Sequence, residues 1–408
     1  MKKMQTSVLV ILSLIGLSTI IATPVCAYSN YWVSRNPMPT AKYYLGAAVA
    51  IGRIYVINED NLTNEEYDPS TDSWTQKTSM LPVSESGTFA VVSCRDKIYA
   101  LGRGNMNQVY DPATDTWQNK APLPTPRTQI QASAVDGKIY VIGGQSMTSS
   151  GVLNVNEVYD PLTDTWVTKA SAPYSVSQYS SAVLDDKIYV IGGYNAFGSY
   201  NLNQIYDTKN DSWSLGTSPP IAVGDAAAGA TTGMFAPKMI YLVGGNPTNP
   251  TNVTQVYDPA NNSWTLGAQM PTPRGLLAVA VLNDTLYAIG GAQVTLGQSY
   301  PPQVTELTVN EQYFPIGYGL TESLSPSTAI PTAVPSLTPL VTSLPSLSAS
   351  PALSPTPTPS LSLNVNPTAT LSPSPSPSVP EFPAWAILPS LVGMGLLVYF
   401  AKRRRSRQ

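Results

Sequence analysis

Apolar residues follow two different patterns along the chain, one at the ends and one in the middle. Each end carries a single long apolar run, at residues 8–21 and 384–401. Between residues 28 and 318 the apolar runs are short, as in residues 187–191 (KIYVI), and polar or glycine-containing turns separate them. Short runs rich in β-branched and aromatic residues and bounded by turn residues are typical of β-strands. The middle of the chain is therefore predicted to be all-β.

The middle region repeats one unit six times. A tyrosine within the second apolar run of each unit recurs every 41 to 52 residues, and a second tyrosine and a tryptophan follow it. Periods of this length with strand-forming content indicate the blades of a β-propeller. The first tyrosines are Tyr55, Tyr99, Tyr140, Tyr189, Tyr241 and Tyr287, the second are Tyr67, Tyr110, Tyr159, Tyr206, Tyr257 and Tyr313, and the tryptophans are Trp32, Trp74, Trp117, Trp166, Trp213 and Trp264.

Each unit is predicted to form four strands. The first is rich in small residues, which suits the strand nearest the axis of a propeller. The second is almost wholly apolar, as expected for a strand covered on both faces, and it usually ends in two glycines, which permit close backbone approaches. The third carries the second tyrosine and the fourth carries the tryptophan. Between them, the Asp-Pro-x-Thr-Asp elements are predicted to form tight turns rather than calcium loops.

This pattern of four apolar residues, Gly-Gly, Tyr and Trp at fixed offsets resembles the kelch repeat. The resemblance covers residues 28–318 and implies a six-bladed β-propeller. Asn58-Glu59 and Gly102-Arg103 replace the diglycine in the first two units and depart from the family pattern. The sixth unit lacks a tryptophan strand, whereas the chain begins with an unpaired one. We therefore expect the N-terminal strand to complete the last blade and close the ring.

The two ends are predicted to direct the chain to the cell surface. Residues 1–27 combine an N-terminal charge, a short apolar run and small residues before the cleavage position, which is typical of a secretory signal peptide. Residues 319–379 are rich in Ser, Thr and Pro, so they are predicted to form a disordered, glycosylated stalk. Residues 380–408 contain an apolar run long enough for a transmembrane helix, followed by basic residues that should remain cytoplasmic.

The C-terminal segment also carries a short motif, Pro380, Glu381, Phe382 and Pro383, directly before its apolar run. The order of motif, apolar run and arginines resembles the archaeal PEF-CTERM sorting signal. That resemblance implies an archaeal cell-surface protein whose tail is cleaved by an archaeosortase and replaced by a lipid anchor. A plain single-pass membrane anchor is the alternative. In both cases the propeller lies outside the cell.

Composition narrows the chemistry that the chain can carry. The 408 residues include no histidine and two cysteines, Cys26 and Cys94. Catalytic sites that need histidine and histidine-containing metal sites are therefore excluded, and two cysteines cannot form a thiolate zinc site. Without its basic termini the chain is acidic, which disfavours a nucleic-acid partner. No metal and no cofactor is expected.

Two sets of residues are candidates for ligand binding. Arg127 and Arg274 each end a Pro-Thr-Pro-Arg element and could clamp a carboxylate, although a structural role at the start of the first strand explains them as well. The connections between the second and third strands are longer in units 3 to 6, so their surplus is predicted to form binding loops on one face. The aromatic residues of those loops are Tyr194, Phe197, Tyr200 and Tyr300.

The sequence favours a binding module for extracellular protein or glycan partners over an enzyme. Aromatic side chains among amides suit such partners, and five sequons fit a secreted glycoprotein. Two alternatives stay open. One is a surface carbohydrate-active enzyme of the sialic-acid mutarotase or epimerase type, which occurs in the kelch family and would use the two arginines. The other is a structural envelope protein. The sequons are at Asn61, Asn210, Asn252, Asn261 and Asn283.

Overall fold

The computed structural model describes residues 29–59, 61–195, 198–199, 201–246, 248–295 and 303–320. The expected signal peptide (1–27), nearly all of the expected stalk (319–379) and the expected sorting tail (380–408) lie outside the described residues. In the part of the chain that is described, no helix is long and apolar enough to cross a membrane.

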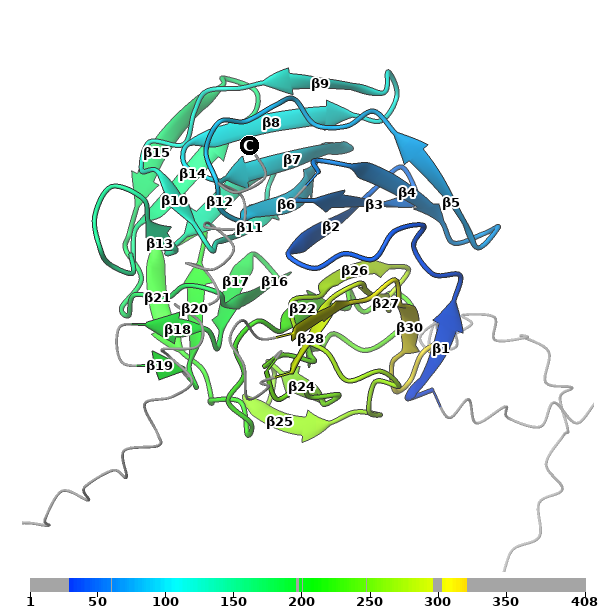
Figure 1. Cartoon of the computed structure of the whole chain (residues 1–408). Helices are drawn as coiled ribbons and strands as arrows, with labels where there is room; N and C mark the ends of the chain where they lie inside the picture. Colours follow the sequence, from blue (N-terminus) through cyan, green and yellow to red (C-terminus); the bar gives the residue numbers. More distant parts are fainter. Residues whose placement is uncertain are drawn as a thin grey trace, which may run out of the picture. The chain divides into compact units, whose positions relative to one another are not determined.

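Six four-stranded antiparallel sheets surround a common axis as the blades of a propeller (Figure 1). Each blade has a first strand at the axis and a fourth strand at the rim. Blades 1 to 3 are β2 (Leu45–Ala50), β3 (Arg53–Asn58), β4 (Asn64–Asp68) and β5 (Ser73–Lys77); β6 (Phe89–Cys94), β7 (Lys97–Gly102), β8 (Met106–Asp111) and β9 (Thr116–Asn119); and β11 (Gln131–Val135), β12 (Lys138–Ile142), β14 (Asn156–Asp160) and β15 (Thr165–Lys169). Blades 4 to 6 are β16 (Ser180–Leu184), β17 (Lys187–Ile191), β20 (Asn203–Asp207) and β21 (Ser212–Leu215); β22 (Ala227–Ala230), β23 (Ile240–Val243), β24 (Thr254–Asp258) and β25 (Ser263–Leu266); and β26 (Ala278–Leu282), β27 (Thr285–Ile289), β30 (Asn310–Phe314) and β1 (Tyr31–Arg35).

The prediction that the N-terminal strand closes the ring is confirmed. Strand β1 pairs antiparallel with β30, and Trp32 lies opposite Tyr313 in the register of the sixth blade. The ring centroids of these two residues are 5.0 Å apart, within the 4.9 to 5.1 Å found for the tyrosine and tryptophan of the other blades. The sixth sheet is thus built from both ends of the propeller, which leaves no open edge between the last blade and the first.

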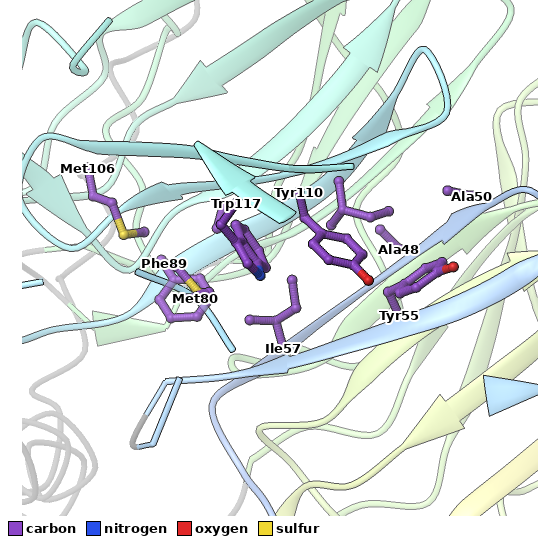
Figure 2. Packing of buried hydrophobic residues seen from close by; sticks show 11 residues of the cluster. Ala48, Ala50, Tyr55, Ile57, Met80, Phe89, Met106, Tyr110 and Trp117 are labelled. Atoms are coloured by element: carbon purple, nitrogen blue, oxygen red, sulfur yellow. The ribbon is translucent and has the colours of Figure 1, made fainter. Parts of the chain in front are cut away.

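The core lies between adjacent blades. Six buried clusters fill the six interfaces between neighbouring blades, and their side chains come mainly from the first two strands and the tyrosines. Figure 2 shows the cluster between blades 1 and 2, where Tyr55 and Ile57 meet Tyr110 and Trp117. The near-continuous apolar second strands predicted from the sequence are buried for this reason: a blade covers each of their faces.

In blades 1 to 5 the turn between the third and fourth strands fastens the blade to the preceding one, and in blade 6 Asn30, directly before β1, takes the part of that turn. In blade 1 the Tyr67 hydroxyl donates to Asp72 Oδ1 at 2.6 Å, and the same oxygen accepts the Asn36 backbone N–H at 2.9 Å. The Trp74 indole N–H donates to the carbonyl of the same Asn36 at 2.9 Å. All six blades repeat this clamp, so the Asp-Pro-x-x-Asp elements are structural turns. The clamped linker residues are Asn36, Thr78, Ala121, Ala170, Thr217 and Ala268.

The diglycine corners explain a second contact between blades. In blade 3, Gly144 has φ of 101°, and a Cβ there would lie 2.9 Å from the Thr128 carbonyl oxygen. Its N–H donates to the Val176 carbonyl, which belongs to the linker leading into blade 4. Blade 2 departs from this pattern, as its sequence indicates: Arg103 takes a left-handed conformation with φ of 46°, and its N–H instead donates to Thr88 of its own blade.

Candidate functional site

The axis of the propeller opens at the end where the six first strands begin. The residue directly before each first strand, or one position earlier, has positive φ in every blade, including Tyr44, Gln129, Gln178 and Asp225. We call the cavity at this end the channel mouth. Its volume is about 70 Å³. Each blade contributes to its lining, from blade 1 to blade 6 through Tyr44, Thr88, Gln129, Gln178, Asp225 and Leu276.

Backbone hydrogen bonds run around the channel mouth from blade to blade. The Gln178 N–H donates to the Gln129 carbonyl at 3.0 Å, the Asp225 N–H to the Gln178 carbonyl at 3.3 Å, and the Leu276 N–H to the Asp225 carbonyl at 2.8 Å. On the other side of Gln129, its N–H donates to the Thr88 hydroxyl oxygen at 2.7 Å. Since these bonds satisfy the backbone groups, recognition at the mouth falls to the side chains.

The lining is more polar where blades 3 to 5 meet the mouth and more apolar at blades 6, 1 and 2, although Thr88 lies among the latter and Ile130 and Ala226 among the former. Gln129, Gln178 and Asp225, from blades 3 to 5, form the polar side. The apolar side comes from blades 6, 1 and 2, through the side chains of Leu276, Leu277, Leu45 and Phe89. A ligand with both a polar group and an apolar stem can therefore contact the two sides at once.

Asp225 dominates the electrostatics of the mouth. Its carboxylate accepts a hydrogen bond from Gln178 Nε2 at 3.0 Å. Burial raises the pKa of the carboxyl to about 7, and the Gln178 hydrogen bond opposes that shift. Burial also raises the pKa of Tyr44 and Tyr194, and the Asp225 charge adds to it, so both hydroxyls remain protonated near neutral pH. Among the described residues that line the mouth, Asp225 is the one carboxylate and no lysine or arginine is present.

The structure places Arg127 and Arg274 in the scaffold rather than at a ligand site. Both side chains are fully buried. Arg127 pairs with Glu157 at 2.6 Å and donates to the Val141 carbonyl at 3.0 Å, and Arg274 repeats this arrangement with Glu311. Burial lowers the pKa of both guanidinium groups and the facing glutamates oppose that shift. Of the two roles considered for these arginines, the structure fits the structural one, because a protein carboxylate already pairs with each guanidinium.

The arginines belong to a position that is charged in blades 1, 3 and 6 and neutral in blades 2, 4 and 5. Where the third strand carries Glu, a threonine hydroxyl and a buried cation bind it. Where it carries Gln, the amide instead exchanges two hydrogen bonds with a linker backbone, as Gln204 does with Tyr174. The charged sets are Thr40-Lys42-Glu65, Thr125-Arg127-Glu157 and Thr272-Arg274-Glu311, and the neutral sets are Leu81-Val83-Gln108, Tyr174-Val176-Gln204 and Ile221-Val223-Gln255.

The surplus loop length predicted for blades 3 to 6 forms additional strands, which make two hairpins and one pair with the segment before a first strand. Strand β10 (Arg127–Thr128) pairs with β13 (Gln145–Ser146), β18 (Tyr194–Asn195) with β19 (Gly198–Ser199), and β28 (Ala292–Thr295) with β29 (Gln303–Glu306). All three lie at the end of the propeller that carries the mouth, because they follow the second strands or precede the first.

The loop aromatics are described only in part. The Tyr194 ring is half-buried against Gly224, where a Cβ would lie 2.1 Å from its Cε2 atom. Tyr194 therefore packs beside Asp225 rather than forming an exposed stacking platform. The side chains of Phe197, Tyr200 and Tyr300 lie outside the described residues, and their binding role stays a prediction.

Other expected features have definite places in the fold. Cys94 is a buried free thiol, and burial raises its pKa, as expected for a small core residue. Within the described ranges, no group of three or more Cys, Asp or Glu side chains could hold a metal ion. Four sequon asparagines are exposed and the fifth is partly exposed, which leaves them accessible for modification; the exposed ones are Asn61, Asn210, Asn261 and Asn283, and the other is Asn252.

Comparison with known proteins agrees with the geometry of the blades. Residues 104–291 match the KLHDC2/KLHL20/DRC7 Kelch-repeats domain. Kelch-like protein 35 from Mus musculus is 28% identical over 126 residues, which is 29% of this chain and 21% of that protein. Kelch-like protein 40 from Xenopus tropicalis is 36% identical over 70 residues, which is 17% of this chain and 11% of that protein. The chain thus spans at most about a fifth of the length of these two relatives.

The fold has a counterpart among solved structures. The structure of YjhT superposes with a TM-score of 0.56 and 14% identity, and the match covers 67% of this chain and 99% of that one. At this identity the likeness concerns the fold. The described residues thus form a six-bladed β-propeller, and residues 104–291 of that propeller match a kelch-repeat domain.

Proposed function

We propose that the chain is a cell-surface-anchored binding module whose propeller holds an extracellular protein or glycan partner at the channel mouth. The observation that carries this proposal is the set of side chains from all six blades that converge there, with Asp225 and Gln178 on one side and leucines on the other. Kelch propellers commonly bind proteins, which supports a protein partner. The signal peptide at residues 1–27 and the membrane or lipid anchor at residues 380–408 belong to this proposal.

The chain path supports an outward-facing mouth. Strand β22 begins at Ala227, two residues after Asp225 at the mouth, and its four residues lead about 10 Å away from the mouth to Ala230 at the usual rise per residue. The loop that follows β22 contacts the last described residues of the chain, since the Gly319 N–H donates to the Phe235 carbonyl at 2.7 Å. The chain therefore leaves the propeller at the end opposite the mouth, and an anchor attached there would leave the mouth free for partners.

The described residues give the enzyme alternative no comparable support. A mutarotase-type enzyme would use Arg127 and Arg274 to bind its substrate, but both arginines form ion pairs with buried glutamates. Proton transfer between two groups would also call for a second acid or base beside Asp225, and none is found among the described lining residues except the protonated tyrosines.

The test is a binding screen with matched variants at the two ends of the propeller. Full chain purified in detergent is applied to a glycan array and to a surface-protein extract, as wild type, Gln178→Ala and Lys209→Ala. Lys209 is exposed and pairs with Asp186 at the far end. The proposal expects a bound partner whose affinity falls at least tenfold in Gln178→Ala and is unchanged in Lys209→Ala. Equal affinity in all three forms would place the binding surface elsewhere.

A further inference from the structure

We infer that the channel mouth takes a cationic side chain of a protein partner, a lysine or an arginine, with Asp225 as its counter-ion and the leucines as the seat of its aliphatic stem. This inference rests on the proposed function and chooses between its two partner classes. It follows from the size of the cavity, the arrangement of its two sides and the charges around Asp225.

The size of the mouth fits the end of a side chain. Sites that enclose a whole small molecule are typically about 300–1,000 Å³ in volume, whereas the mouth holds about 70 Å³. A sugar ring would have to lie outside, where it could not reach both sides of the cavity. An unbranched stem with a compact charged head can enter end-on, because its width is that of a methylene chain.

The two sides of the mouth match the two parts of such a side chain. Lysine and arginine carry an apolar stem and a charged head, and they bury the stem where the head can keep polar contacts. Leu276 and Leu277 are largely buried but line the cavity with apolar atoms for the stem, and the Gln178 amide, which is hydrogen-bonded to Asp225, lies where the head would bind. The Tyr44 ring, also in the lining, can contribute a cation–π contact.

Among the described residues, no lysine or arginine pairs with Asp225. The titratable groups that act with it are Tyr44, at the entry to blade 1, and Tyr194, in β18, and both are neutral. Glu59 acts on Tyr44 as a further negative charge. One amide hydrogen bond, from Gln178, opposes the cost of burying the carboxylate. An incoming cation would supply the missing charge partner, and an anion would be repelled.

Binding of a cation is then coupled to loss of a proton from Asp225. A carboxyl with a pKa of about 7 is mostly ionised at pH 8 and mostly protonated at pH 6. The cation binds the ionised form, so the apparent dissociation constant should rise about tenfold from pH 8 to pH 6. A neutral ligand held by hydrogen bonds to the amides would show no such rise.

The experiment titrates the full chain in detergent with N-acetyl-lysine methylamide, and in parallel with the norleucine analogue, which keeps the stem and lacks the charge. The expected result at pH 8 is at least tenfold tighter binding of the lysine probe, and a tenfold loss at pH 6. Asp225→Asn should remove both differences. Asp136→Asn is the matched control, because Asp136 is another carboxylate at positive φ (48°) but lies in the turn at the opposite end.

Two results would overturn this inference: equal binding of the two probes, or lysine binding by Asp225→Asn at the wild-type level. The pH series on the unaltered protein gives an answer that needs no substitution. The proposed function is tested separately. If the lysine probe fails while Gln178→Ala still weakens a captured partner, the mouth binds another chemistry and only the cationic assignment falls.

Discussion

The hydroxyl of Tyr313 donates to Asn30 Oδ1 at 2.7 Å, which joins two residues 283 positions apart in the chain. In four of the other five blades an aspartate five residues after the tyrosine accepts this bond, and in blade 5 an asparagine does. Blade 6 has no such turn of its own. Asn30, directly before β1, takes the place of the missing residue, and its Oδ1 also accepts the Ala268 N–H.

Removal of this closure should destabilise the whole ring. Trp32→Ala would remove a packed indole and its 2.9 Å hydrogen bond to the Ala268 carbonyl. Because Trp32 is partly buried, we expect a loss of about 3 kcal/mol in the free energy of unfolding, at the lower end of the range for buried aromatic residues. Denaturant unfolding measures it. Ser34→Ala, an exposed change on the same strand, should stay within about 0.5 kcal/mol of wild type. A Trp32→Ala protein as stable as the Ser34→Ala protein would contradict this view of closure.

The Glu of a third strand should be replaceable by Gln only if the buried cation that faces it is replaced by Val at the same time. Glu157→Gln would leave the Arg127 charge buried without its partner, and we expect a cost of about 3–5 kcal/mol. Adding Arg127→Val recreates the residue pair found in blades 2, 4 and 5 and should recover part of that loss. Unfolding of the single and double variants measures the coupling between the two sites.

The control for this cycle is a surface pair in the same blade. Lys138→Gln removes an exposed partner of Asp160 and should cost less than about 1 kcal/mol. If the losses of Glu157→Gln and Arg127→Val simply added in the double variant, the two residues would not form one unit.

Asp225 should also make stability depend on pH. Its folded-state pKa, about 7, lies above the usual value for an aspartate, so the folded chain holds this proton more tightly than the unfolded chain. Its contribution to stability is therefore fully present below about pH 4 and is lost as the pH rises through 7. Thermal unfolding between pH 5 and 8 should show that Asp225→Asn flattens the fall in Tm, whereas Asp136→Asn leaves the slope as in wild type. Parallel slopes in wild type and Asp225→Asn would show that Asp225 does not carry this proton.

The sorting tail gives a prediction that can be tested in the native host. If residues 380–408 are processed as a unit, mass spectrometry of the surface protein should find peptides from the propeller and none from Ala401 onward. Peptides that reach Gln408 would leave the plain membrane anchor as the explanation.

The blades could be predicted from the sequence because their contacts depend on residue type at fixed spacing. The tyrosines and tryptophans pair across neighbouring strands and clamp the preceding linker, so they recur in phase. Closure was predictable for the same reason, since Trp32 stood alone at the start and the sixth unit lacked its tryptophan.

The channel mouth could not be predicted in this way, because its residues share a backbone conformation and not a side-chain type. Tyr44, Gln129, Gln178 and Asp225 all have positive φ before a first strand, yet no common sequence pattern marks them. Arg127 resembled a ligand clamp because its partner, Glu157, is 30 residues away on another strand. A comparison of third-strand Glu and Gln across the units would have revealed that pairing.

The most direct test of the binding site at the mouth is to block it chemically. Gln178→Cys and Asp136→Cys place a thiol at the mouth and at the opposite end, while Cys94 is buried. Each variant is labelled with a bulky maleimide, and its affinity is measured for the partner found in the binding screen. We expect labelled Gln178→Cys to lose at least tenfold in affinity and labelled Asp136→Cys to bind as the wild type does. Undiminished binding by labelled Gln178→Cys would contradict it.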